Sequence, residues 1–268
     1  MVRPNADGSE YQMRLGCHIV PDRRLEKREL QESDKVATQK SNEALGYSRK
    51  MMQVQCAAIL FDMDGVLINS TPAVARVWRK WAIERGFNPE EVVARAHGRP
   101  SLTTVREYLP NADHDAENRE VERREIEDTG GIVPLPGAVE LLASLPTDRW
   151  IIVTSSTMAL AKVRLRAAEL LLPQKLVTAS DITRGKPHPE PYLMGASALG
   201  FPPTECVVFE DIPAGVRAGK AAGAKVVAFT TTVSEFELKH AGADWVLSSC
   251  ADVHVTGHTP DLMLRLGR

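Results

Sequence analysis

The sequence predicts an α/β protein built on a parallel sheet with helices on both faces. Short apolar runs recur along the chain, and segments with apolar residues at three-to-four spacing lie between them. Because parallel strands need a crossover connection, this alternation favours a parallel sheet that is covered on both sides. One stretch, residues 71–132, interrupts the alternation, and it predicts a small all-helical domain inserted after the first strand.

The predicted strands are short and strongly apolar, as expected for strands buried on both faces. The first is the run Val54–Phe61, which ends abruptly at Asp62. Further strands are predicted at Trp150–Val153, Lys175–Thr178, Cys206–Phe209 and Lys225–Phe229, with a weaker one at Asp244–Leu247. Helical spacing predicts helices between them at Gly137–Leu145, Thr157–Leu172, Glu190–Leu199, Ala214–Ala222 and Ser234–Ala241.

The interrupting stretch carries four charged helical patterns, at residues 71–85, 89–96, 101–109 and 113–128. A turn signal at Ser70-Thr71-Pro72 marks where the chain leaves the core, and Gly130-Gly131 marks its return. Two such linkers can form a hinge. We therefore expect a catalytic core of residues 53–70 and 133–268, in which the last 20 or so residues receive no assignment, and a helical cap of residues 71–132.

Composition limits the partners of this 268-residue chain. Lys and Arg number 33 against 35 Asp and Glu, so the formal charge of −2 provides no general attraction for nucleic acid or anionic membranes. No apolar segment is long enough to span a bilayer, and residues 1–50 contain no secretory signal, so we expect a cytoplasmic protein. Residues 1–52 are rich in charge and predict a disordered extension, and translation could begin at Met51 or Met52.

Polar side chains follow the predicted strands where each one ends. Asp62 and Asp64 follow the first strand, and Thr154 and Ser155 follow the second. Lys186 comes after the third, and the fourth is followed by the pair Glu210 and Asp211. The carboxyl ends of parallel strands line one crevice, so these side chains should converge. A lone Asp-x-Asp usually marks only a turn, but the joint order of these motifs on successive strands is far more specific.

Each of these residue types suits phosphoryl transfer. Carboxylates gathered at Asp62, Asp64, Glu210 and Asp211 would repel one another without a divalent cation, and oxygen ligands suit Mg²⁺. Asp62 could then attack phosphorus, while Asp64 acts as acid and base. The Lys186 ammonium could bind phosphoryl oxygens. Thr154 and Ser155 precede a predicted helix, and their hydroxyl and amide groups could hold phosphate there.

Four segments resemble the motifs of the haloacid dehalogenase superfamily of phosphohydrolases. They are Phe61-Asp62-Met63-Asp64-Gly65, Val153-Thr154-Ser155-Ser156, Gly185-Lys186-Pro187 and Phe209-Glu210-Asp211. The placement of the helical segment is similar to the β-phosphoglucomutase-like branch, and the segments around Lys186 and after Pro213 look closest to glycerol-phosphate and 2-deoxyglucose-6-phosphate phosphatases. The resemblance implies a Rossmann-like core with a helical cap.

The resemblance also implies roles for individual residues. Asp62 would be the nucleophile and Asp64 the acid and base, with Mg²⁺ held by Asp62, the Asp64 carbonyl and Asp211, assisted by Glu210. Thr154, Ser155 and Lys186 would bind phosphate. Arg99 lies in a segment resembling the loop with which relatives meet the non-phosphate end of the substrate, although a surface arginine is an equally good interpretation.

The expected activity is Mg²⁺-dependent hydrolysis of small sugar or polyol phosphates through an aspartyl phosphate. A phosphomutase is the first alternative, but Val74 stands where the mutase carries a histidine, which favours water as the acceptor. A non-catalytic module that binds phosphorylated metabolites is the second alternative. The intact set of acids disfavours this alternative, because a site without catalytic function would not need carboxylates that repel one another.

Overall fold

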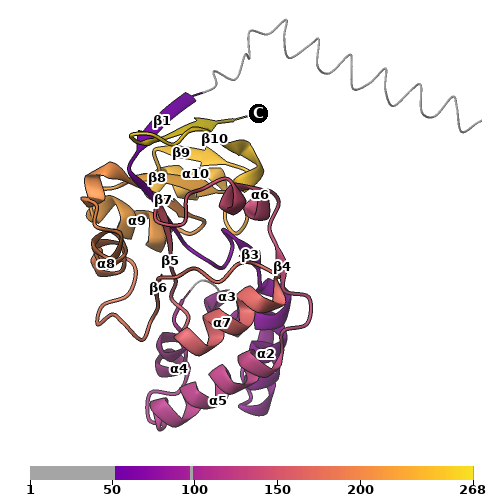
Figure 1. Ribbon diagram of the computed structural model, residues 1–268. Coiled ribbons are helices and arrows are strands. Elements are labelled where there is room, and N and C mark those ends of the chain that lie inside the picture. The colour runs from indigo at the N-terminus through magenta and orange to yellow at the C-terminus, as the bar shows by residue number, and fades with distance from the viewer. Residues whose placement is uncertain (1–51, 97–98, 268) are drawn as a thin grey trace, which may run out of the picture. The chain divides into compact units, whose positions relative to one another are not determined.

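The computed structural model describes residues 52–96 and 99–267 (Figure 1). The extension expected at residues 1–52 lies outside these ranges except for Met52, which begins strand β1 (Met52–Cys56). Among the helices of the described residues, none combines the length and the apolar character that crossing a bilayer would require.

A six-stranded parallel sheet forms the centre of the molecule, as predicted. Every pair of neighbouring strands runs parallel. Strand β2 lies near the middle of the sheet, so the residue that follows it is surrounded by neighbouring strand ends. The order across the sheet is β6 (Leu176–Val177), β5 (Trp150–Val153), β2 (Ala58–Phe61), β7 (Cys206–Glu210), β8 (Lys225–Phe229) and β9 (Trp245–Leu247).

Both faces of the sheet are buried. In β2, Ala58 and Leu60 face one apolar cluster, whereas Ile59 and Phe61 face another, as the two-residue period of a strand requires. The first cluster contains side chains of α8 (Glu190–Leu199), α9 (Pro213–Ala221) and α10 (Glu235–His240). The second contains side chains of α6 (Ala138–Ala143) and α7 (Met158–Ala167).

The second face is also covered by a small antiparallel sheet that the sequence did not predict. Its strand order is β1, β11 (Leu262–Leu266) and β10 (Val253–Gly257), and its leucines join the apolar cluster. The single strand predicted at Val54–Phe61 is therefore wrong. The chain bends at Ala57, whose amide donates to the Glu205 carbonyl over 2.7 Å, and passes from one sheet to the other.

Several predicted boundaries also shift. Thr157 caps α7 instead of starting it, and the helix ends at Ala167, five residues before the predicted Leu172. Glu169 explains the early end, because its φ of +54° is left-handed and cannot continue an α-helix. Two short 3₁₀ helices, Pro203–Glu205 and Cys250–Asp252, complete the elements around the sheet.

In the segment between β3 (Ile68–Asn69) and β4 (Val133–Pro134), the described residues form helices and no strand, as expected. We call residues 71–127 the helical insertion: α2 (Thr71–Glu84), α3 (Pro89–Ala96), α4 (Ser101–Tyr108) and α5 (His114–Glu127). It has its own apolar cluster around the buried Trp78 and Trp81. The two connections to the core lie side by side, because β3 and β4 pair as antiparallel strands.

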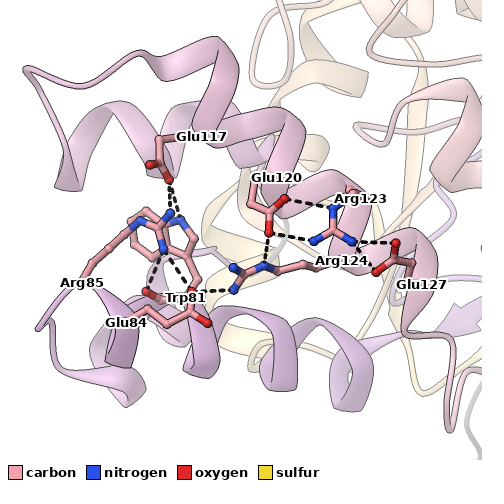
Figure 2. Close-up of polar contacts among 8 residues, drawn as sticks. All are labelled: Trp81, Glu84, Arg85, Glu117, Glu120, Arg123, Arg124 and Glu127. Atoms are coloured by element: carbon pink, nitrogen blue, oxygen red, sulfur yellow. Dashed lines mark hydrogen bonds and ion pairs between the residues drawn. The ribbon is translucent and has the colours of Figure 1, made fainter.

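A network of arginines and glutamates ties α5 to α2 within the helical insertion (Figure 2). Arg124 of α5 contacts Glu84 of α2 at 2.8 Å and Glu120 of its own helix at 2.7 Å. Arg85, just after α2, pairs with Glu117 of α5. Each of the three arginines in Figure 2 pairs with two of the four glutamates, so this network holds helices together and leaves little charge without a partner.

Candidate active site

The centre of the sheet brings three carboxylates together. Strands β2 and β7 are parallel neighbours with Phe61 opposite Phe209, and the Asp62 amide donates to the Phe209 carbonyl over 2.9 Å. This register sets Asp62 beside Glu210 and Asp211, where the two strands end. One oxygen atom from each of these three side chains lies within 4.8 Å of the others. The structure therefore brings together three of the four acids that the sequence analysis grouped.

Lys186 reaches into this carboxylate cluster. Its Nζ lies 2.7 Å from Asp62 Oδ1 and 2.7 Å from Glu210 Oε1. The lysine side chain is only 4% exposed and the Glu210 side chain is fully buried, so water screens these ion pairs weakly. The Lys186 side chain can therefore hold the Asp62 carboxylate in a fixed orientation.

Burial and mutual repulsion shift the ionisation of the cluster. Burial raises the pKa of Asp62 from 3.8 to about 7, with Lys186 opposing this shift and Glu210 adding to it. Burial and then the charge of Glu210 raise the pKa of Asp211 well above its usual range. Burial would lower the pKa of Lys186, but the charges of Asp62 and Glu210 together raise it. Three carboxylates thus share one ammonium group, and their simultaneous ionisation is unfavourable unless a further cation is present.

The donor set fits a divalent cation. Three carboxylates offer the hard oxygen ligands that such ions prefer. Among residues 52–96 and 99–267, Asp211 Oδ1 is one of the few buried side-chain atoms that has no hydrogen-bond partner. A buried oxygen of this kind is costly unless something binds it, and a cation would satisfy it. Asp62, Glu210 and Asp211 can therefore hold a metal ion.

Two glycines make room for these carboxylates. A Cβ atom on Gly65 would lie 1.8 Å from Asp211 Oδ2, and the φ of this residue is +80°. A Cβ atom on Gly215, in α9, would lie 1.7 Å from Glu210 Oε1. Both distances are far below contact, so only glycine fits at either position. The Asp-x-Asp-Gly sequence and the glycine in α9 are thus requirements of the carboxylate cluster.

The Asp64 side chain lies outside the group of metal-ligand candidates. Ser70 donates to Asp64 Oδ1, and Ser156 donates to Asp64 Oδ2 over 3.3 Å. Arg164, from α7, donates from Nη1 to the same Oδ2 over 3.0 Å. Both oxygens of Asp64 are therefore oriented by neighbouring side chains. The sequence analysis grouped the Asp64 carboxylate with the other three acids, and the structure does not place it among them. A contribution of the Asp64 backbone carbonyl to the metal, which the resemblance implied, stays a prediction.

The predicted phosphate-binding residues line one cavity with the acids. This cavity has a volume of about 450 Å³, and Thr154, Ser155 and Lys186 line it together with Asp62 and Asp64. The Thr154 hydroxyl accepts a hydrogen bond from the Ser156 amide over 3.1 Å, which orders the loop between β5 and α7. A cavity of this size suits a small phosphorylated metabolite.

The helical insertion supplies the other wall of the cavity. Arg99, the predicted substrate contact, lies there together with Val74. The Arg99 guanidinium is not free, because Nη2 pairs with Glu107 Oε2 at 3.0 Å and Nη1 donates to the Arg95 carbonyl. The structure places Arg99 at the cavity but leaves its role toward substrate a prediction.

Several polar residues of the site were missed by the sequence reasoning. Tyr192 donates its hydroxyl to Glu210 Oε1 over 2.6 Å, and Thr232 donates to Asp211 Oδ2. Neither has a local signal, because each reaches the cluster only through tertiary packing. Arg164 does have one: it lies four residues after Leu160 and just before Leu165, on the apolar side of a predicted helix. A charged residue there needs a buried partner.

Comparisons with known proteins show which family this chain resembles. Residues 56–223 match the model of the haloacid dehalogenase-like hydrolase family. Hexitol phosphatase A of Escherichia coli is 43% identical over 208 residues, which cover 76% of this chain and 95% of that protein. Glycerol-1-phosphate phosphohydrolase 2 of Saccharomyces cerevisiae is 34% identical over 81% of this chain and 92% of that protein.

A solved structure agrees. That of a putative β-phosphoglucomutase from Bacteroides vulgatus aligns with a TM-score of 0.62 and 30% identity, over 81% of this chain and 92% of that one. The family match covers the strands and loops that supply Asp62, Lys186 and Asp211. The chain therefore belongs to the haloacid dehalogenase-like hydrolase family.

Proposed function

We propose that this protein is a Mg²⁺-dependent phosphatase that hydrolyses small sugar or polyol phosphate monoesters through an aspartyl phosphate on Asp62. The observation that carries the proposal is the geometry around Asp62. It joins a metal-binding group of carboxylates, contacts Lys186 at 2.7 Å, and lines a cavity that also contains Asp64. The relatives named above act on hexitol and glycerol phosphates, which supports the substrate class.

In the first half of the reaction, an oxygen of the Asp62 carboxylate attacks phosphorus and the bond from phosphorus to the substrate oxygen breaks. Asp64 gives a proton to the departing alkoxide, which leaves as the alcohol. In the second half, Asp64 takes a proton from a water molecule whose oxygen attacks the same phosphorus. The bond from phosphorus to Asp62 then breaks, and inorganic phosphate is released.

The other residues hold the phosphoryl group. Lys186 pairs with the nucleophile and can bind a phosphoryl oxygen, while Thr154 and Ser155 offer hydroxyl and amide donors at the end of β5. A Mg²⁺ ion held by Asp62, Glu210 and Asp211 would neutralise charge between the anionic substrate and the carboxylates. The helical insertion would act as a cap that excludes bulk water and adds specificity. We expect this to occur in the cytoplasm.

A phosphomutase is the second candidate, because the structural neighbour from Bacteroides vulgatus is a putative β-phosphoglucomutase. Val74 lines the cavity and has no group that can accept or donate a proton. Water is therefore the better acceptor for the phosphoryl group. The alternative of a binding module without activity is disfavoured, because the contact of Lys186 with Asp62 at 2.7 Å supports a role of Asp62 as nucleophile.

Phosphate release from a panel of esters tests the proposal. The panel contains glycerol 1-phosphate, hexitol 6-phosphates, 2-deoxyglucose 6-phosphate, phosphoglycolate and glucose 1-phosphate, each with Mg²⁺. We expect inorganic phosphate as the product from at least one sugar or polyol ester. For glucose 1-phosphate, the isomer is measured alongside phosphate. A product dominated by glucose 6-phosphate would favour the mutase, and binding without any turnover would contradict both enzymatic functions.

A further inference from the structure

A buried arginine that the proposed mechanism does not use lies between the helical insertion and Asp64. Arg164 belongs to α7, and its side chain is 7% exposed. Its Nη1 donates over 3.0 Å to Asp64 Oδ2 and over 3.0 Å to Ser156 Oγ. Ser156 in turn donates to the same Asp64 oxygen. The guanidinium, the serine hydroxyl and the carboxylate thus form a closed triangle around one oxygen atom.

The other side of the guanidinium faces the helical insertion. Arg164 Nη2 lies 3.4 Å from Glu125 Oε2, and the Glu125 side chain is also 7% exposed. Glu125 belongs to α5, which packs against α7 (Figure 1). A second contact lies at the N-cap of α7, where the Thr157 hydroxyl donates to Glu122 Oε1 of α5. A continuous polar chain therefore runs from α5 through Arg164 to Asp64.

This arrangement differs from an ordinary ion pair between helices. Burying the guanidinium and the Glu125 carboxylate is costly, and a pair that only joined α5 to α7 could be replaced by apolar side chains without loss. The guanidinium is instead shared between the helical insertion and the proposed acid. A planar, forked donor can fix the direction of a carboxylate, which a flexible ammonium group does less well.

We propose that Arg164 is a positioning residue for Asp64, and that Glu125 of the helical insertion holds Arg164 in place. The role rests on the proposed function, because it acts through Asp64 as the acid that protonates the leaving alcohol. Docking of α5 against α7 would then complete the orientation of the acid. Arg164 touches neither substrate nor phosphorus in this role.

The dependence of kcat/KM on the leaving group distinguishes a role of Arg164 in positioning Asp64 from a purely structural role. A sugar or polyol alkoxide is a poor leaving group and needs the proton of Asp64, whereas p-nitrophenolate leaves without one. The value of kcat/KM reports steps up to phosphorylation of Asp62, so it is insensitive to the later hydrolysis by water. Loss of acid positioning should therefore lower kcat/KM for the best ester of the panel much more than for p-nitrophenyl phosphate.

The variants are Arg164→Met, Arg164→Lys and Glu125→Gln. For Arg164→Met we expect kcat/KM to fall by about 100-fold with the alkyl ester, the lower range for loss of acid–base catalysis, and by less than about 10-fold with p-nitrophenyl phosphate. Asp64→Asn should show the same discrimination between the two esters. Arg164→Lys should recover part of the loss, and Glu125→Gln should show a smaller loss of the same kind.

Two further variants keep the test decisive. Arg164→Met leaves Glu125 buried and unpaired and could prevent folding, so the double variant Arg164→Met/Glu125→Gln removes both charges together and should keep the leaving-group effect. Arg85→Met is the matched control, because it breaks an arginine–glutamate pair inside the helical insertion, away from the cavity (Figure 2). It should leave the ratio of the two kcat/KM values unchanged.

The outcomes are distinguishable. Wild-type turnover of the ester panel is measured first, and its absence would overturn the proposed function itself. With an active wild type, equal losses on the alkyl and aryl esters, or no loss in the folded double variant, would overturn the role of Arg164 alone. A ratio changed as much by Arg85→Met as by Arg164→Met would overturn it as well.

Discussion

Two groups of charged side chains in this protein follow opposite rules. The network between α2 and α5 is half-buried at Arg85 and Arg124 and exposed at Arg123, and each of these arginines pairs with two glutamates (Figure 2). The carboxylate cluster at the end of β2 and β7 is buried, and Lys186 is shared there between Asp62 and Glu210. Ion pairs that solvent can reach contribute little to stability. Buried, unbalanced charge is unstable alone, and it identifies the part of the molecule that binds something.

The largest effect is expected when Asp62, the proposed nucleophile in the buried carboxylate cluster, is replaced. Asp62→Asn keeps the shape of the side chain but removes the attacking oxygen's charge. We expect turnover of sugar phosphates to fall by roughly 10⁴-fold or more, the scale on which loss of a covalent nucleophile acts. The variant should fold and melt at a temperature no lower than the wild type, because one repelling carboxylate is gone. Substantial hydrolysis by a folded Asp62→Asn protein would contradict the assignment.

Metal removal and changes of pH test whether the buried carboxylate cluster destabilises the protein when no cation is bound. The folded-state pKa of Asp62 is raised from 3.8 to about 7, so the native protein holds a proton that the unfolded chain releases in this range. Without metal, this contribution to stability is present below pH 3.8 and is lost as pH rises through 7. We expect Mg²⁺ to raise the melting temperature more at pH 8 than at pH 5, and EDTA to abolish turnover.

Calorimetry of the EDTA-treated protein at both pH values, with and without added Mg²⁺, measures this difference. Turnover that persists after thorough chelation would show that Glu210 and Asp211 do not hold a required ion. A stabilisation by Mg²⁺ that does not depend on pH would contradict the raised pKa of Asp62.

The smallest effect is expected from the exposed network. Arg123 lies on the surface of α5 and pairs with Glu120 and Glu127. Arg123→Ala should change neither kcat/KM nor the midpoint of urea denaturation beyond experimental error, because solvent screens such pairs. A large loss of stability would show that the network of Figure 2 does more than join helices.

The sequence predicted the parts of the fold that depend on local pattern. The parallel sheet and the helical insertion followed from periodicity, and the site residues Asp62, Lys186 and Asp211 followed from polar residues at strand ends. The bend at Ala57 could not be predicted, because one long strand and two short strands in different sheets have the same apolar pattern in the sequence. The tail strands β10 and β11 were not predicted. They pair with each other, and only β11 pairs with β1, which lies about 200 residues earlier in the chain.

The missed site residues have the same cause. Tyr192 looks like an ordinary core residue in a helix, and only the fold brings its hydroxyl to Glu210. Glu125 sits in a strongly charged helix where nothing distinguishes it from its exposed neighbours. Its burial depends on how α5 meets α7. Arg164 was also missed, but it differs from Tyr192 and Glu125 because the sequence contains a signal for it. A charged residue on the apolar face of a predicted helix needs a buried partner.

The pairing of β1 with β11 joins Met52 to Leu266 and Cys56 to Leu262. During synthesis on the ribosome, β1 emerges first and must wait for β11 before this pairing can form. The parallel strands can assemble earlier, whereas the part of their apolar core that β1 and β11 cover stays open until β11 has been made. Chaperone dependence of the nascent chain would be concentrated in this interval.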